Sequence, residues 1–142
     1  MTSVDDRGGS PSVETAVITV VVGVLIAFAV AGGRLVAAES ALDQAARAAA
    51  RAASLQRDAS AAEGAARRAA EVGLGTSGTR CRSLDVRIDT AGFDAPIGVP
   101  AAVTARLRCD VDWSDLGLPG VSGGRVTEAT FASPIDQWRE RS

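Results

Sequence analysis

The chain has 142 residues and a net charge of −2, a length that suits about one domain. It contains neither histidine nor tyrosine, which excludes a His-based general base, a Ser/His/Asp triad and an imidazole metal site. The near-neutral charge argues against nucleic-acid binding, and the composition leads us to expect no cofactor and no metal.

An uncharged run occupies residues 15–33, directly after Glu14. As a helix it would be about 28 Å long, close to the ~30 Å hydrocarbon core of a bilayer. It lacks the polar face that a core helix of so small a protein would need. We therefore predict a transmembrane helix within residues 10–33. A cleaved secretory signal is the alternative, because AVA at 29–31 and VAA at 36–38 suit a signal peptidase.

An alanine-rich helical region is predicted over residues 34–72, because alanine is the best helix former. Charges at every fourth position form a polar stripe, with a favourable pair expected between Asp43 and Arg47. The stripe consists of Glu39, Asp43, Arg47 and Arg51. The opposite side carries Leu35, Leu42, Ala46, Ala49 and Ala53. These small residues either let a neighbouring helix approach closely or merely fill a helix in an alanine-rich chain.

A pause is expected near residues 56–60, followed by a second helix. Ser60 and Glu63 fit a capping box, in which the serine would be the N-cap. The second helix is predicted to end at about Val72, because Gly73 and Gly75 follow. The segment GLGTSGTR then has the composition of a loop.

Residues 73–142 are predicted to form a small β-sheet domain with three antiparallel strands, because hydrophobic residues alternate with polar ones. The apolar positions are Leu84, Val86 and Ile88 in the first strand and Val103, Ala105, Leu107, Cys109 and Val111 in the second. RVTEATFAS is the third strand, and Pro134 is expected to end it. The fold class is therefore α+β, a long N-terminal helix followed by a thin sheet that needs a helix on one face.

Two cysteines, Cys81 and Cys109, are enough for one disulfide but not for a thiolate metal site. Cys109 lies on the apolar face of its strand, whereas Cys81 has the opposite parity to Leu84. The two meet only if Cys81 precedes the regular pairing or sits at a bulge. Such a crosslink would contribute on the order of 3 kcal/mol. The alternative is two unrelated buried thiols.

No catalytic constellation is found in the sequence, and we expect a protein that is not an enzyme. Asp110, Asp112 and Asp115 cluster near Ser114, but no constellation of base and nucleophile accompanies them. They could also mimic a Ca²⁺ loop, but the glycine that an EF-hand loop requires is missing. A solvated face is the simpler interpretation. Sheet packing is the expected role of the two tryptophans, with membrane-interface anchoring as the alternative. They are Trp113 and Trp138.

The orientation in the membrane is left open by these features alone. Arg34, Arg47 and Arg51 follow the span and only Arg7 precedes it, which places the C-terminal part in the cytoplasm by the positive-inside rule. Long domains are largely exempt from that rule, and a disulfide favours an oxidising compartment.

A motif ahead of the span, GSPSVE from Gly9 to Glu14, resembles the processing site of type IV prepilins. In that family a membrane peptidase cuts after a glycine, and glutamate is the fifth mature residue. The longer stretch RGGSPSVE…RAASL is similar to the N-terminal half of actinobacterial TadE-like proteins, minor pilins or pseudopilins of the tight-adherence (Flp/Tad) pilus. The C-terminal part also resembles that family in its two cysteines, its DLGLPG loop and its closing SPID.

The resemblance implies a leader at residues 1–9, a cut between Gly9 and Ser10, and an assembly role for Glu14. It implies a structural component of the pilus whose partners are the membrane, a prepilin peptidase, other Tad pilins and the Tad assembly machinery. The leader would be cytoplasmic and the C-terminal domain extracytoplasmic, as part of a surface pilus. The sequence departs from type IV pilins because the mature chain would begin with Ser10 and Pro11 rather than phenylalanine or methionine. An uncleaved single-pass accessory or binding protein is the alternative.

Overall fold

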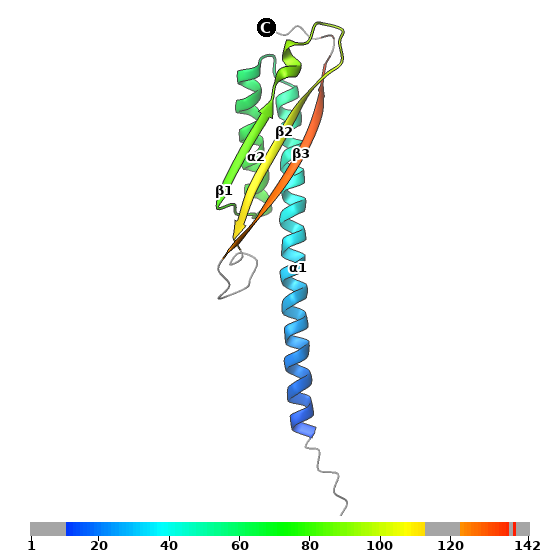
Figure 1. Cartoon of the computed structure of the whole chain (residues 1–142), viewed down its shortest axis with the longest axis vertical. Helices are drawn as coiled ribbons and strands as arrows, with labels where there is room; N and C mark the ends of the chain where they lie inside the picture. The colour runs from blue at the N-terminus through cyan, green and yellow to red at the C-terminus, as the bar shows by residue number, and fades with distance from the viewer. Residues whose placement is uncertain (1–10, 113–122, 137, 139–142) are drawn as a thin grey trace, which may run out of the picture.

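The structure is dominated by one long helix, α1 (Pro11–Ser54), of 44 residues. The computed structural model describes residues 11–112, 123–136 and 138. Pro11 suits the first helical position because its missing N–H would have no intrahelical partner there. Alanine and uncharged aliphatic residues then continue the helix without an internal proline. The predicted membrane segment and the first part of the alanine-rich region are thus one uninterrupted rod (Figure 1).

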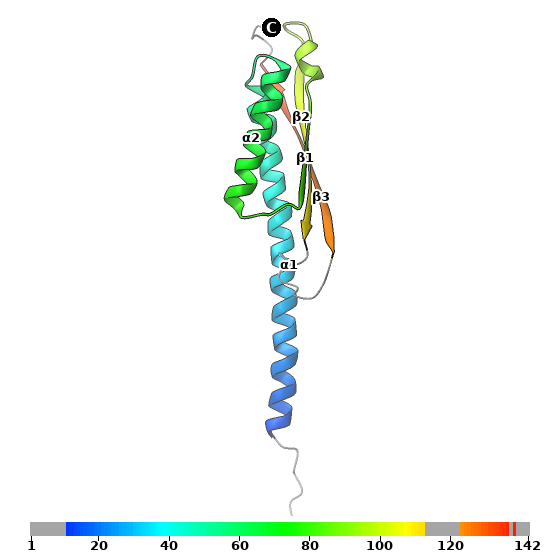
Figure 2. The ribbon, with the colours of Figure 1, turned by 90° about the vertical axis from the view of Figure 1, so that its left-hand side faces the viewer.

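The N-terminal half of α1 extends beyond the rest of the molecule (Figures 1 and 2). Residues 13–30 are all exposed, and within the described part of the chain α1 is the helix that is long and apolar enough to cross a membrane. The C-terminal half, by contrast, has a buried stripe. Its fully buried members include Leu42, Ala45, Ala46, Ala49, Ala50 and Ala53. The N-terminal half of α1 therefore suits an apolar environment such as a membrane, whereas the C-terminal half packs against the rest of the protein.

The second helix, α2 (Ala59–Ser77), follows a break at the predicted place but differs from the prediction at both ends. Its N-cap is Asp58 rather than Ser60, because the Asp58 carboxylate accepts the backbone N–H of Ala61 at 2.8 Å. It also continues through the two glycines that were expected to stop it. Its C-cap is Gly78, whose φ of 69° is the left-handed conformation that glycine adopts readily.

Close packing between α1 and α2 explains why α2 passes through the glycine-rich segment. α2 buries a stripe with helical spacing, namely Ala62, Ala66, Ala70 and Leu74. A Cβ atom added at Gly73 would lie 3.5 Å from the backbone of Ala45. Small residues on both helices thus allow backbones to approach, and the burial offsets the low helix propensity of glycine, about 1 kcal/mol per residue. The alanines of α1 therefore pack against neighbours rather than merely fill a helix.

Three antiparallel strands form a meander in the order β1-β2-β3. They are β1 (Ser83–Asp89), β2 (Ala101–Asp112) and β3 (Gly124–Ile135), and a short 3-10 helix, η1 (Ala91–Asp94), lies between the first two. Val86 pairs with Leu107, and Leu107 with Ala129, so that buried residues line up across the sheet. The predicted α+β fold is confirmed.

Pro134 does not end the third strand as expected, because it pairs with Ala102 inside β3. β3 is an edge strand in the described sheet. Proline is tolerated at a sheet edge because its missing N–H can face away from the neighbouring strand.

The two helices cover one face of the sheet, and the other face is open (Figures 1 and 2). The core therefore lies in one layer between helices and strands. Its largest fully buried side chains are Leu42, Val103, Leu107 and Cys109. The open face carries charged residues, with Arg108 on β2 opposite both Asp85 on β1 and Glu128 on β3. This alternation is the half-buried pattern predicted for the strands.

Candidate functional site

The N-terminal end of α1 carries an isolated carboxylate at the edge of the apolar run. Glu14 lies in the first turn of the helix and is exposed. A negative charge there interacts favourably with the helix dipole, by roughly 0.3–1 kcal/mol. The next charged residue along the chain is Arg34, about 30 Å farther along the axis at about 1.5 Å per residue. The two charges thus bracket a length close to that of the bilayer core.

Gly9 and Ser10, the residues of the predicted processing site, lie outside the described residues. The structure begins at Pro11, immediately after them. The proposed cut, between Gly9 and Ser10, would therefore fall one residue before α1 begins at Pro11. The leader at residues 1–9 and the cut between Gly9 and Ser10 stay sequence-based predictions.

A side-chain hydroxyl inside the apolar run forms its hydrogen bond within α1 itself. The Thr19 hydroxyl donates to the carbonyl oxygen of Thr15 at 2.8 Å. Such back-bonding removes the need for water around a hydroxyl in hydrocarbon. The Thr19 hydroxyl therefore does not oppose membrane insertion.

A disulfide joins Cys81 to Cys109, with 5.3 Å between their Cα atoms. Cys81 lies two residues before β1, while Cys109 is fully buried in β2 and pairs with Leu84. The crosslink therefore forms because Cys81 precedes the regular pairing, which was one of the two geometries that the sequence allowed. With a sequence separation of 28, it contributes on the order of 3 kcal/mol in the chain-entropy model.

An ion pair fixes the same segment from the open side of the sheet. The Arg82 guanidinium binds the Asp112 carboxylate, and the Arg82 backbone N–H donates to the Asp110 carbonyl at 2.7 Å. The hydrogen bond to Asp112 raises the pKa of Arg82 above its ordinary value. Asp110 and Asp112 thus hold Arg82 against the sheet, and both are partly exposed, as expected for a solvated face.

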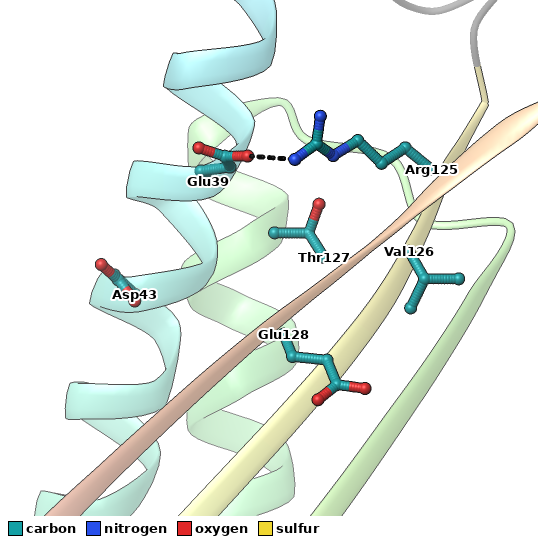
Figure 3. A pocket seen from close by; sticks show the side chains of 6 residues that line it. All are labelled: Glu39, Asp43, Arg125, Val126, Thr127 and Glu128. Atoms are coloured by element: carbon teal, nitrogen blue, oxygen red, sulfur yellow. Dashed lines mark ion pairs between the residues drawn. The ribbon is translucent and has the colours of Figure 1, made fainter.

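A surface pocket of about 320 Å³ lies between α1 and β3. Figure 3 shows Glu39 and Asp43 on α1, with Arg125 reaching from β3 to pair with Glu39 across 3.7 Å. Both partners are about half exposed, so the pair contributes roughly 0–1 kcal/mol. The buried Thr127 hydroxyl has no hydrogen-bond partner among the described residues.

Metal binding finds no support in the part of the chain that the structure describes. Within residues 11–112, 123–136 and 138, no three acidic, histidine or cysteine side chains converge on one position. Trp113, Ser114 and Asp115 lie outside these ranges. Trp138 is 82 % exposed, so the prediction that it packs on the sheet is wrong.

Two contacts between α1 and β3 were not expected from the sequence. Ser54 and Ser133 share a buried hydrogen bond of 3.0 Å. Arg47 places its guanidinium 5.1 Å from the centre of the Phe131 ring, instead of forming the expected ion pair with Asp43. The spacing of Ser54 from Ala50 and Ala46 indicated its buried position, but its partner depends on the tertiary fold.

The comparison with protein families bears on α1. The family described as TadE-like protein matches residues 9–51. This chain carries a TadE-like segment. The match confirms the resemblance over the motif, the apolar run and most of the alanine-rich part of α1, and it indicates a Tad pilus-associated protein. It ends before α2, so the TadE-like character of the sheet stays a prediction. No curated protein and no solved structure matches the chain.

Proposed function

We propose that this TadE-like chain is a minor pilin or pseudopilin-like structural component of tight-adherence pilus assembly. The observation that carries the proposal is the position of Glu14. It stands in the first turn of one continuous helix of 44 residues, directly before the uncharged run and inside the TadE-like match at 9–51. A subunit that inserts by such a helix can pack in a membrane and then in a filament through the same apolar surface.

Processing gives Glu14 its role. A cut between Gly9 and Ser10 would create an α-amine on Ser10, which is positive at neutral pH. Glu14 lies four residues after Ser10, close to one helical turn. In an apolar bundle the carboxylate and the amine of a neighbouring subunit attract each other, although desolvation offsets much of the gain. The larger effect is on register, because a wrongly docked subunit leaves a charge unpaired.

The proposed orientation places the N-terminus in the cytoplasm and the helix–sheet body outside. The Cys81–Cys109 disulfide supports it, because such bonds persist in oxidising compartments. Arg34, just after the span, argues for the opposite orientation, but the body is long enough to be exempt from the positive-inside rule. The proposed partners are a prepilin peptidase, other Tad pilins and the Tad assembly machinery, and the proposed role is not enzymatic.

An uncleaved single-pass anchor is the second candidate, and one observation favours it. A chain cut after Gly9 would begin with Ser10 and Pro11, unlike the phenylalanine or methionine start of type IV pilins. In that case Glu14 would be only a helix N-terminal acid interacting with the dipole.

Substitution of Glu14 tests the proposed function. In cells that produce Tad pili, Glu14→Ala is expected to leave membrane insertion intact but to reduce incorporation into sheared pili on the order of tenfold or more. The physical reason is that removing one partner of a buried ion pair costs about 3–5 kcal/mol. Quantitative immunoblots of the pilus and membrane fractions measure the ratio.

Glu63→Ala is the matched control, because Glu63 is an exposed acid on α2. It should incorporate as the unsubstituted protein does. Normal incorporation of Glu14→Ala would show that the carboxylate has no assembly role and would leave the anchor as the better explanation.

A further inference from the structure

The pocket between α1 and β3 carries a net negative charge, and we call it the acidic pocket. Its lining is Glu39, Asp43, Arg125, Val126, Thr127 and Glu128. Glu39 pairs with Arg125, and Glu128 pairs with Arg108 of β2 at 3.3 Å. Asp43 forms no ion pair within the part of the chain that the structure describes. Beyond the internal pairs, the acidic pocket therefore keeps one uncompensated carboxylate.

A buried hydroxyl gives the acidic pocket a second group for hydrogen bonding. The Thr127 hydroxyl oxygen is buried and has no hydrogen-bond partner among the described residues. Figure 3 shows Thr127 on β3, with Glu39 and Asp43 across from it on α1. An unpaired buried polar group is unfavourable, and a guanidinium group has five N–H donors with which it can bind a carboxylate and a hydroxyl together. The acidic pocket therefore suits an arginine side chain.

A pocket of about 340 Å³ at the β1 edge of the open face has the complementary charge, and we call it the basic pocket. It is lined by Arg87, Ile88 and Asp89 on β1 and by Thr104 and Arg106 on β2. Arg87 lies directly opposite Arg106 in the strand register. Like charges directly opposite each other destabilise a sheet.

Arg106 is the cation of the basic pocket that has no compensating acid. Arg87 pairs with Asp85 at 2.9 Å, and the Asp89 carboxylate accepts the Ala91 backbone N–H at 3.0 Å. Arg106 is exposed and forms no ion pair within the described part of the chain. The single chain thus keeps two arginines side by side, an arrangement that a carboxylate from outside would stabilise.

We propose that Arg106 of one copy docks in the acidic pocket of a second copy of this chain, against the Asp43 carboxylate and the Thr127 hydroxyl. Charge complementarity favours this occupant, because one chain provides both the uncompensated carboxylate and the uncompensated guanidinium. The acidic pocket borders β3 and the basic pocket borders β1, which are opposite edges of the described sheet. A contact between two different surfaces can repeat from copy to copy, as in a helical filament.

The contact requires an offset between the two copies along the rod. β3 begins nearer the exposed apolar half of α1 and ends at the far end of the body (Figure 1). Arg106 pairs with Thr130, whereas the acidic pocket reaches only to Glu128. These two levels on β3 differ by about 7 Å, at about 3.3 Å per residue. The copy that offers its acidic pocket must therefore be displaced by this length toward the far end of its partner.

This offset links the inference to the proposed function, on which it rests. The pair between the Ser10 amine of one subunit and the Glu14 carboxylate of another also requires an offset, because the two residues are four apart in the chain, about 6 Å along a helix. The displaced copy would supply the amine, so both contacts need a shift in the same direction. Two copies with α1 at equal depth in a membrane have no such shift. We therefore expect the Arg106 contact in staggered, assembled subunits.

A cross-link through one introduced amine tests the contact. The chain contains no lysine, so Arg106→Lys adds a single lysine side chain that a carbodiimide can join to a carboxylate, and the positive charge is kept. Cells that produce Tad pili are treated with a water-soluble carbodiimide, and the linked peptides of the dimers are identified by mass spectrometry. We expect dimers in which the introduced lysine is joined to Asp43. One copy cannot form this link within itself, because Arg106 lies on the open face and α1 covers the other face.

Arg67→Lys is the matched control, because Arg67 is an exposed arginine on α2 that lines neither pocket. Its dimer yield should be roughly fivefold lower, the factor that one exposed ion pair contributes. Asp43→Asn, added to Arg106→Lys, should reduce the dimer yield to that of the control. Equal yields in the two lysine variants, or no effect of Asp43→Asn, would overturn the contact. A link from the introduced lysine to a different protein would overturn the second copy as the occupant.

The fraction in which the dimers appear separates this outcome from failure of the proposed function. Chains that enter sheared pili without the link to Asp43 would overturn the contact alone and leave the pilin-like function standing. Dimers joined through Asp43 in the membrane fraction only would keep the contact between copies and contradict its place in a pilus.

Discussion

Asp58 is the residue that caps the start of α2, and its carboxylate makes the stability of this cap depend on pH. Its carboxylate accepts the Ala61 N–H at 2.8 Å and the Ser60 hydroxyl at 2.7 Å. These bonds, the one from Ala61 first, hold the pKa of Asp58 below its ordinary value of 3.8. A lowered pKa in the folded state means that the carboxylate stabilises the fold above about pH 4 and that this contribution is lost as the pH falls through the folded value.

The variant Asp58→Asn separates the cap from the charge. Asparagine caps helices about as well as aspartate but does not titrate there. At neutral pH the two proteins should have similar thermal midpoints, measured by circular dichroism. From about pH 4 to about pH 2 the unsubstituted protein should lose stability relative to the variant. A difference in midpoint that stays constant across this range would show that the Asp58 charge contributes nothing.

At the scale of elements, the contact of α1 with the rest of the body depends on side chains no larger than a methyl group. Ala49 is fully buried, whereas its neighbour Ala48 is exposed on the same helix. Ala49→Leu is expected to destabilise the body by about 1–3 kcal/mol, because a close-packed core accommodates added methylenes only by moving backbone or forcing rotamers.

Ala48→Leu makes the same chemical change on the exposed side of the turn. Its thermal midpoint should remain within about 0.5 kcal/mol of the unsubstituted protein. The measurement is the cooperative loss of β-sheet circular dichroism in detergent. If Ala49→Leu and Ala48→Leu were equally stable, the buried alanines of α1 would not be closely packed against their neighbours.

The elements that the sequence predicts well are those that depend on a pattern of neighbouring residues along the chain. Alternation identified the strands because one face of the sheet is buried and the other is open. The end of α2 was predicted wrongly because the glycine signal is also local, whereas Gly73 is held in the helix by its approach to Ala45 of α1. The prediction that Pro134 ends β3 was wrong for a related reason. Proline is tolerated in a strand at a sheet edge, and whether a strand lies at the edge is a property of the whole sheet.

Contacts between segments that are distant along the chain could not be predicted from the sequence. Arg125 pairs with Glu39, and Arg47 lies over Phe131, although spacing along α1 suggested that Arg47 would pair with Asp43. Only the tertiary fold brings β3 against this face of α1. The disulfide was easier to anticipate, because two cysteines have one pairing and their strand parity limited the geometry to two arrangements.

At the scale of the whole molecule, the chain is a rod with a small helix–sheet body on one end (Figure 1). The exposed apolar half of α1 is the part that must find a membrane or other subunits. The body is held together by alanine packing, one disulfide and a three-stranded sheet. This arrangement suits a subunit that is anchored by the apolar end of α1 and exposes the body at the other end. In the proposed function, the Glu14 carboxylate sets the register in which such subunits dock.

The mature N-terminus tests this account most directly. We expect the intact mass and N-terminal peptide of the membrane-extracted protein to show a chain that begins at Ser10. Gly9→Val should block the cut, and Gly8→Val, the adjacent glycine, should leave it unchanged. A chain that retains Met1 or Thr2 beside an active prepilin peptidase, or that begins near Gly32 or Ala38, would contradict the pilin-like function.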